Sequence, residues 1–221
     1  MSAMRTIKVT GKGKSRVTPD AVRLTLNMEG TYPEYQETLR HSVQDTAKLR
    51  ELLMQLGFKG TDLKSPYFYL DTKYEQVQVR DSYEYQFVGY QYEHEMKVEF
   101  PFDNDRLGKI LQALAASPLN PTIKIGYTVR DPEAVRNYLL GKAVRDAAEK
   151  AEVLASASKV KLKEIQSADY SWGELDLAVY PIHGNCLREA VSDANCDEYN
   201  LGIEPDEMEV EDTVTIVWEI E

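Results

Sequence analysis

The stretch YQFVGYQYEHEMKVEFP, from Tyr85 to Pro101, decides the predicted fold. From Val88 onward, apolar or aromatic residues and His94 alternate with polar residues, interrupted only by Gly89: the even positions hold Val88, Tyr90, Tyr92, His94, Met96, Val98 and Phe100. Successive side chains of a strand point to opposite faces of a sheet, so this period of two predicts a strand with one buried and one wet face. His94 falls on the buried face, and we interpret it as a core histidine with satisfied hydrogen bonds.

Similar alternation predicts strands on both sides of this stretch. Ile7 and Val9 indicate a short first strand that ends in a turn at GKGK, residues 11–14. The last strand must pair with strands formed by earlier residues, so both ends of the chain belong to one fold. The other predicted strands are residues 22–29, an extended segment 63–80 that turns back near 81–82, residues 123–129 and the closing residues 213–220.

Three segments have the 3.6-residue period of amphipathic helices. The first spans about 33–56, with Gly57 as a C-terminal cap; its apolar stripe is Leu39, Val43, Ala47, Leu49, Leu52, Leu53 and Leu56. The second begins after Asp103, which can cap it, and Phe102 and Leu107 have the spacing of a hydrophobic staple. Its stripe is Leu107, Ile110, Leu111 and Leu114.

The third helix begins at Asp131-Pro132-Glu133 and extends to about Ser158. Its stripe of mostly small residues, Val135, Leu139, Ala143, Ala147, Ala151 and Ala155, predicts close packing on a sheet or on the first helix. Together these elements predict an α+β fold, an antiparallel or mixed sheet with long helices packed on it. No linker divides the chain, so we expect a single domain over residues 1–221 with an acidic insertion at about 173–204.

The net charge of -11 argues against a nucleic-acid partner, because phosphate binding depends on clustered Lys and Arg. The whole imbalance lies between Glu174 and Asp212, where twelve Asp and Glu accompany the single Arg188. No apolar run is long enough for a membrane-spanning helix. The first residues contain no apolar signal segment, so we expect a cytoplasmic chain, or a periplasmic or exported one if a leader has been removed.

The order of these elements resembles the SIMPL-domain family, also called YggE-like proteins, over nearly the whole chain. The resemblance is carried by I-x-V-x-G-x-G from Ile7 to Gly13, T-P-D at 18–20, L-x-x-L-G at 53–57, V-G-Y at 88–90, the Ala-rich segment 143–155 and I-E-P-x-x-x-x-V at 203–210. It implies an α+β fold, assembly into homo-oligomers that are rings in some relatives, and an association with stress tolerance and the bacterial envelope. It implies no catalytic residues. The segment 173–202 is longer and more acidic than the family pattern.

Candidate metal ligands lie in the acidic segment. Asp193, Asn195, Asp197, the Tyr199 carbonyl and Glu204 fall at positions 1, 3, 5, 7 and 12 of a calcium loop, but Glu198 replaces the usual Gly at position 6. We therefore interpret this segment as a solvated acidic loop, with calcium binding as the alternative. His183, Cys186 and Cys196 lack the close C-x-x-C spacing of zinc sites, and a bridge between the two cysteines stays open. We assign no metal or cofactor site.

Seven of the fourteen tyrosines lie between Tyr67 and Tyr92. We interpret them as structural strand residues, with an aromatic binding platform as the alternative. No nucleophile elbow or phosphate-binding loop is present, and no catalytic residue is assigned. The sequence thus favours a non-enzymatic, self-assembling protein associated with stress or the envelope. The alternative is a small-molecule or calcium-binding protein, or an enzyme, that uses the acidic loop or the tyrosine-rich hairpin.

Overall fold

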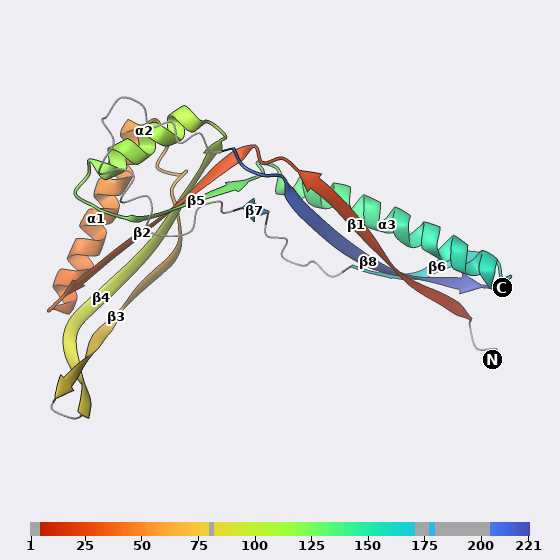
Figure 1. Ribbon diagram of the computed structural model, residues 1–221, viewed down its shortest axis with the longest axis horizontal. Coiled ribbons are helices and arrows are strands. Elements are labelled where there is room, and N and C mark those ends of the chain that lie inside the picture. The colour runs from red at the N-terminus through yellow and green to blue at the C-terminus, as the bar shows by residue number, and fades with distance from the viewer. Residues whose placement is uncertain (1–4, 80–81, 171–176, 180–203) are drawn as a thin grey trace. The chain divides into compact units, whose positions relative to one another are not determined.

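The computed structural model describes residues 5–79, 82–170, 177–179 and 204–221 (Figure 1). The chain divides into two compact units, of which unit 1 comprises Met1–Pro19, Val129–Val179 and Pro205–Glu221, and unit 2 comprises Asp20–Thr128 and Tyr180–Glu204. The α+β fold class is confirmed, with two antiparallel sheets and three helices among the described residues. The single domain with an acidic insertion stays a prediction.

Unit 1 contains an antiparallel sheet of three strands. Strands β1 (Thr6–Val17), β8 (Met208–Ile220) and β6 (Leu162–Asp169) lie in the order β1-β8-β6. Because β8 lies in the middle, the last strand pairs with the first along its length, from Thr6 opposite Glu219 to Val17 opposite Met208. The predicted joining of the two chain ends in one fold is confirmed. A two-residue strand, β7, spans Ala178–Val179.

Helix α3 (Pro132–Ala157) runs along β1 and β8 and covers one face of this sheet (Figure 1). Its predicted start is confirmed, because the Asp131 side chain accepts a hydrogen bond from the Ala134 backbone N–H at 2.9 Å. The small-residue stripe is buried and packs on the sheet. The core of this contact is Val9, Ala143, Ala147, Ala151, Val214, Ile216 and Trp218.

The predicted turn at residues 11–14 is wrong, because β1 continues through GKGK to Val17. The two glycines instead allow a close helix-to-strand approach. A Cβ atom on Gly11 would collide with the Ala143 carbonyl oxygen and lie 2.5 Å from the Ala147 backbone nitrogen. A Cβ atom on Gly13 would collide with the Leu139 carbonyl. The glycines of the strand and the alanines of the helix therefore form one close contact between backbones.

Unit 2 is built on four antiparallel strands that lie side by side in the order β3 (Lys64–Val79), β4 (Ser82–Pro101), β2 (Ala21–Tyr32) and β5 (Thr122–Thr128). The second half of β4 confirms the predicted alternation, because the even positions from Tyr92 to Phe100 are buried. Tyr90 is half-buried, and Val88 is 39% exposed. The buried face of β4 therefore ends near Tyr90.

Helices α1 (Tyr35–Gln55) and α2 (Asn104–Ala115) cover one face of these strands (Figure 1). The Asp103 side chain caps α2 by accepting from the Arg106 backbone N–H at 3.0 Å, and the predicted stripe of α2 is buried. Gly57 has φ 83°, in the left-handed region expected for a C-terminal cap of α1. The predicted beginning of α2 and the predicted end of α1 are both confirmed.

The predicted apolar stripe of α1 is wrong in its first half. Leu39 and Val43 are 41% and 60% exposed, and Thr38 and Ser42 are buried in their place. The Thr38 hydroxyl donates to the Glu34 carbonyl at 2.9 Å, and the Ser42 hydroxyl donates to the Leu39 carbonyl at 2.8 Å. A hydroxyl that is satisfied by its own helix can be buried at low cost, so a stripe defined by apolar residues alone misplaces this face.

Two buried tyrosines of this core allow a matched test. The Tyr92 hydroxyl donates to Asp45 Oδ2 at 2.8 Å, whereas the Tyr127 hydroxyl is buried with no hydrogen-bond partner among the described residues. We expect Tyr92→Phe to lower the free energy of unfolding by about 1 kcal/mol. Tyr127→Phe should leave it unchanged or raise it, because no bond is lost. Urea unfolding measures the free energy of unfolding of both variants. Equal losses of stability would contradict the assignment of a stabilising hydrogen bond to Tyr92 and not to Tyr127.

Candidate functional site

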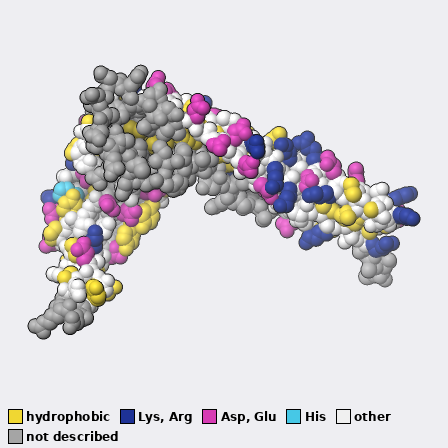
Figure 2. Space-filling view, viewed as in Figure 1, with side chains coloured by type: hydrophobic (Ala, Val, Ile, Leu, Met, Phe, Trp, Pro, Cys, Tyr) yellow, Lys and Arg dark blue, Asp and Glu magenta, His cyan; other side chains and the backbone are white. Residues whose placement is uncertain are grey.

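Nine large apolar side chains are exposed on the hairpin formed by β3 and β4. They are Tyr67, Phe68, Tyr69, Tyr74, Val77, Tyr83, Tyr85, Phe87 and Val88. Figure 2 shows hydrophobic side chains along this hairpin. Folded proteins rarely expose grouped apolar residues unless these form an interaction surface. Five of the seven tyrosines predicted to be structural are among these residues, which favours the alternative of a surface role.

A β-bulge in β4 arranges these side chains. Lys73 pairs with Gly89, but Tyr74 pairs with Phe87, so Val88 is an extra residue in β4. An extra residue reverses the alternation of faces beyond it. Phe87 therefore lies on the same face as Tyr90, and their rings pack edge to face with centroids 5.5 Å apart.

Beyond the bulge no third strand pairs with the hairpin among the described residues, because β2 ends at Tyr32, opposite Tyr90. We call residues 74–78 and 83–87 the ribbon. Its cross-strand pairs are Tyr74 with Phe87, Gln76 with Tyr85 and Gln78 with Tyr83, and these six residues form what we call the aromatic face. Glu75, Val77, Glu84 and Gln86 lie on the opposite face. The ribbon thus separates aromatic residues from carboxylates.

The aromatic face continues the side of the sheet that α1 covers. Tyr90 lies on the face of β4 that carries Tyr92, and its ring also packs edge to face on Tyr35 in the first turn of α1, at 5.5 Å. Tyr74 extends the series by packing on Phe87 at 5.7 Å. Aromatic contacts therefore connect the beginning of the helix to the ribbon, where no described element covers the aromatic face.

His94 has the structural role that the sequence predicted. It is 8% exposed and lies between two hydroxyls, with Nδ1 2.9 Å from Thr46 Oγ1 and Nε2 2.9 Å from Ser65 Oγ. The Thr46 hydroxyl donates to the Ser42 carbonyl at 2.7 Å, so it accepts from Nδ1–H and leaves Nε2 to accept from Ser65. This arrangement satisfies neutral histidine. Burial, and secondly the positive charge of Arg50, lower the pKa of His94.

We expect acid to destabilise the protein through His94. In the unfolded chain this histidine takes up a proton near pH 6.5, whereas the folded state resists protonation because the pKa of His94 is lowered. The contribution of neutral His94 to the stability of the folded state is therefore complete above about pH 6.5. This contribution is lost as the pH falls through the pKa of His94 in the folded state. Urea unfolding at several pH values should show that the free energy of unfolding falls as the pH is lowered below about 6.5. His94→Gln should reduce the slope of this dependence on pH. An unchanged slope in the variant would contradict the assignment.

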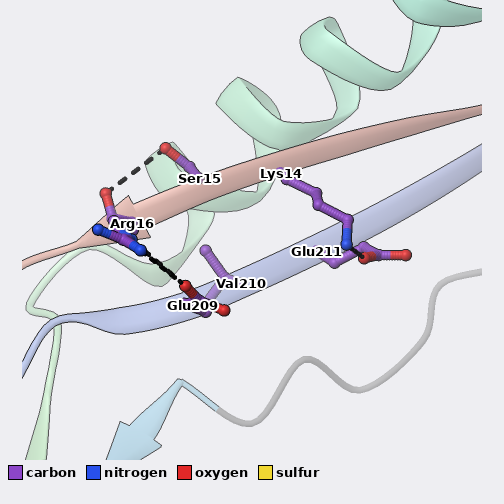
Figure 3. Close-up of a pocket in the computed structure, with 6 residues that line it drawn as sticks. All are labelled: Lys14, Ser15, Arg16, Glu209, Val210 and Glu211. Atoms are coloured by element: carbon purple, nitrogen blue, oxygen red, sulfur yellow. Dashed lines mark hydrogen bonds and ion pairs between the residues drawn. The ribbon is translucent and has the colours of Figure 1, made fainter.

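A surface pocket of about 360 Å³ lies where β1 meets β8 in unit 1. Figure 3 shows Lys14 reaching toward Glu211 and Arg16 toward Glu209, and the ion pairs measure 2.7 and 3.2 Å. Lys12 also contacts Glu211, at 3.0 Å. The Lys14 ammonium, through its hydrogen bond, lowers the pKa of Glu211. Because these cations already have carboxylate partners, an anionic ligand would have to displace Glu209 or Glu211.

These pairs also explain part of the acidic excess of the sequence. Glu209 and Glu211 belong to β8 and face basic residues of β1, so this end of the acidic segment is part of the sheet. The candidate ligands His183, Cys186, Asp193, Asn195, Cys196, Asp197 and Tyr199 lie outside the described residues. Glu204 is described and exposed. Within the described ranges, no group of three or more His, Cys, Asp and Glu side chains could hold a metal ion.

Comparison with known families finds one family model that matches residues of both units. Residues 7–218 match the family model SIMPL, described as a protein of unknown function (DUF541). The chain belongs to the SIMPL family. The match includes residues of both units, from Ile7 in β1 to Trp218 in β8, and the predicted resemblance is confirmed. No curated protein sequence matches this SIMPL chain.

The structure gives a reason for the I-x-V-x-G-x-G motif of this SIMPL chain. Ile7, Val9, Gly11 and Gly13 all lie in β1, and the two glycines contact α3. The V-G-Y motif similarly contains the extra residue of the bulge and Gly89. Both motifs shape the backbone.

Among the helices of the described residues, none is long and apolar enough to cross a membrane.

Proposed function

We propose that this SIMPL protein acts by assembling with copies of itself and has no enzymatic activity of its own. The observation that carries the proposal is the group of nine exposed apolar side chains on the β3–β4 hairpin. Apolar residues at a protein surface gain stability when a partner removes them from water. A self-assembled scaffold of this kind would serve the envelope- or stress-associated role that the family resemblance implies.

The chemistry of the buried titratable groups supports a structural role. His94 is held neutral between two hydroxyls, and Tyr92 donates to Asp45. Burial is the first cause that raises the pKa of both Tyr92 and Tyr127. Catalytic acids and bases need pKa values near the working pH, whereas these shifts keep each group in its neutral form.

The proposal is tested by the mass of the protein in solution. Light scattering behind a sizing column, or sedimentation velocity over a wide concentration range, should show a species larger than the monomer of 25.2 kDa. A strict monomer at every concentration would overturn the assembly. Turnover of a substrate from a broad hydrolase panel, retained through repeated purification, would overturn the non-enzymatic part.

A further inference from the structure

We infer that two copies of the protein assemble through the aromatic face of the ribbon. This face packs against the same face of the second copy about a twofold axis. This inference rests on the proposed self-assembly and assigns its interface. Four aromatic rings lie on the face, and Tyr74, Tyr83, Tyr85 and Phe87 are 54%, 64%, 75% and 46% exposed. The register places all four on one side of two paired strands.

The ribbon lacks the support that the rest of the sheet has. From Lys64 to Thr72, β3 pairs with a part of β4 that is itself paired to β2, but in the part of the chain that the structure describes the ribbon has two strands alone. A two-stranded hairpin is marginally stable in water, and stability requires a third strand or a layer packed on its apolar face. For the neighbouring residues α1 supplies that layer, since Tyr35 packs on Tyr90. A second ribbon would supply it beyond the end of the helix.

Charge favours a second copy as the occupant. The excess of negative charge lies at residues 174–212, and the ribbon itself contributes only Glu75 and Glu84. The aromatic face consists of Tyr, Phe and Gln and contains no Asp or Glu, whereas Glu75 and Glu84 lie on the opposite face. Packing two aromatic faces together therefore brings no carboxylates of the ribbon into the contact. The same acidic surroundings disfavour an anionic membrane or a nucleic acid as the partner.

The exposed area reaches the lower bound for a specific dimer. With about 150–250 Å² for each aromatic side chain, the four rings expose roughly 500 Å² in one copy at the fractions given above. Face-to-face packing of two copies would then bury roughly 1,000 Å², the lower limit for a specific interface. Tyrosine is also enriched among the residues that dominate binding energy, because its rigid ring loses little entropy on packing.

The test compares variants on the two faces of the ribbon. Tyr83→Ser combined with Tyr85→Ser removes two exposed rings, and we expect the dissociation constant of the assembly, measured by sedimentation, to rise by roughly 100-fold or more. The matched control, Val77→Ser combined with Gln86→Ser, changes the opposite face and should leave the dissociation constant within about threefold of the wild type. Thermal unfolding at a concentration where all proteins are monomeric should show that both variants fold.

The outcomes separate this inference from the proposed function. If the wild-type protein assembles and the double tyrosine variant assembles equally well, the interface assignment is wrong and self-assembly stands. Equal weakening by both pairs of substitutions would indicate pairing along the strand edge and would also overturn the assignment. A wild-type protein that is always monomeric overturns both, and the ribbon would then bind a different protein or nothing. Loss of assembly in the tyrosine variant alone supports the inference.

Discussion

Gly11→Ala should destabilise unit 1 more than a change of one methyl group does at most other sites. The new Cβ atom would collide with the Ala143 carbonyl oxygen and lie 2.5 Å from the Ala147 nitrogen. Both are backbone atoms, so no side-chain rotation relieves the contact, and α3 must move away from β1. Overpacking of a tight contact costs about 1–3 kcal/mol, and we expect the upper end of this range or more.

Gly141→Ala is the matched control for this prediction. Gly141 lies in the same helix, and a Cβ atom there would meet no other atom within 4 Å. Replacing an exposed helical glycine by alanine should raise the free energy of unfolding by up to about 1 kcal/mol. Urea unfolding followed by the far-ultraviolet circular dichroism would measure both changes. A Gly11→Ala protein as stable as the wild type would show that α3 does not depend on this close approach.

The sequence predicted those elements whose residues follow one simple period. The alternation from Tyr90 to Phe100 identified the buried face of β4, and the Asp131-Pro132 pair identified the beginning of α3. Both depend on local properties, namely the direction of successive side chains and the capping of free N–H groups. Such properties are independent of what the element packs against. This is why α2 was also predicted correctly, and why β8 was predicted over residues 213–220, although it begins earlier, at Met208.

The errors occurred where a residue is determined by a distant partner. Gly11 and Gly13 were interpreted as a turn because glycine favours turns, but their role depends on the alanines of α3, more than 120 positions later. The predicted stripe of α1 left out Thr38 and Ser42, because a sequence does not show which hydroxyl is satisfied by its own helix. The small-residue stripe of α3 was the signal that could have paired the glycines with the helix.

The tyrosine-rich hairpin was predicted only as an alternative site for a similar reason. The tyrosines between 67 and 92 were noticed, but strict alternation does not place Tyr83, Tyr85 and Phe87 on the face of Tyr90. The extra residue Val88 reverses the faces, and its signal in the sequence is the single Gly89 within a strand pattern. A glycine that interrupts a strand therefore carried more information about the orientation of these side chains than the tyrosines alone.

Gly89→Ala should accordingly disturb both stability and assembly. Gly89 has φ 153°, which residues with a side chain rarely adopt, and a Cβ atom there would collide with the Tyr32 carbonyl oxygen and lie 2.9 Å from its carbon. Backbone strain of this kind costs about 1–3 kcal/mol. We expect the free energy of unfolding to fall by about 2–4 kcal/mol once this steric contact is added. Urea unfolding measures the change.

The matched control is Val88→Ala, which keeps the bulge and shortens a side chain that is 39% exposed. It should cost less than about 1 kcal/mol and leave the assembly unchanged. In Gly89→Ala the two strands of the ribbon can no longer hold the bulged register without strain, so the aromatic face loses its fixed orientation, and the dissociation constant of the assembly should rise. A Gly89→Ala protein that is destabilised but assembles as tightly as the wild type would show that the bulge serves the fold alone.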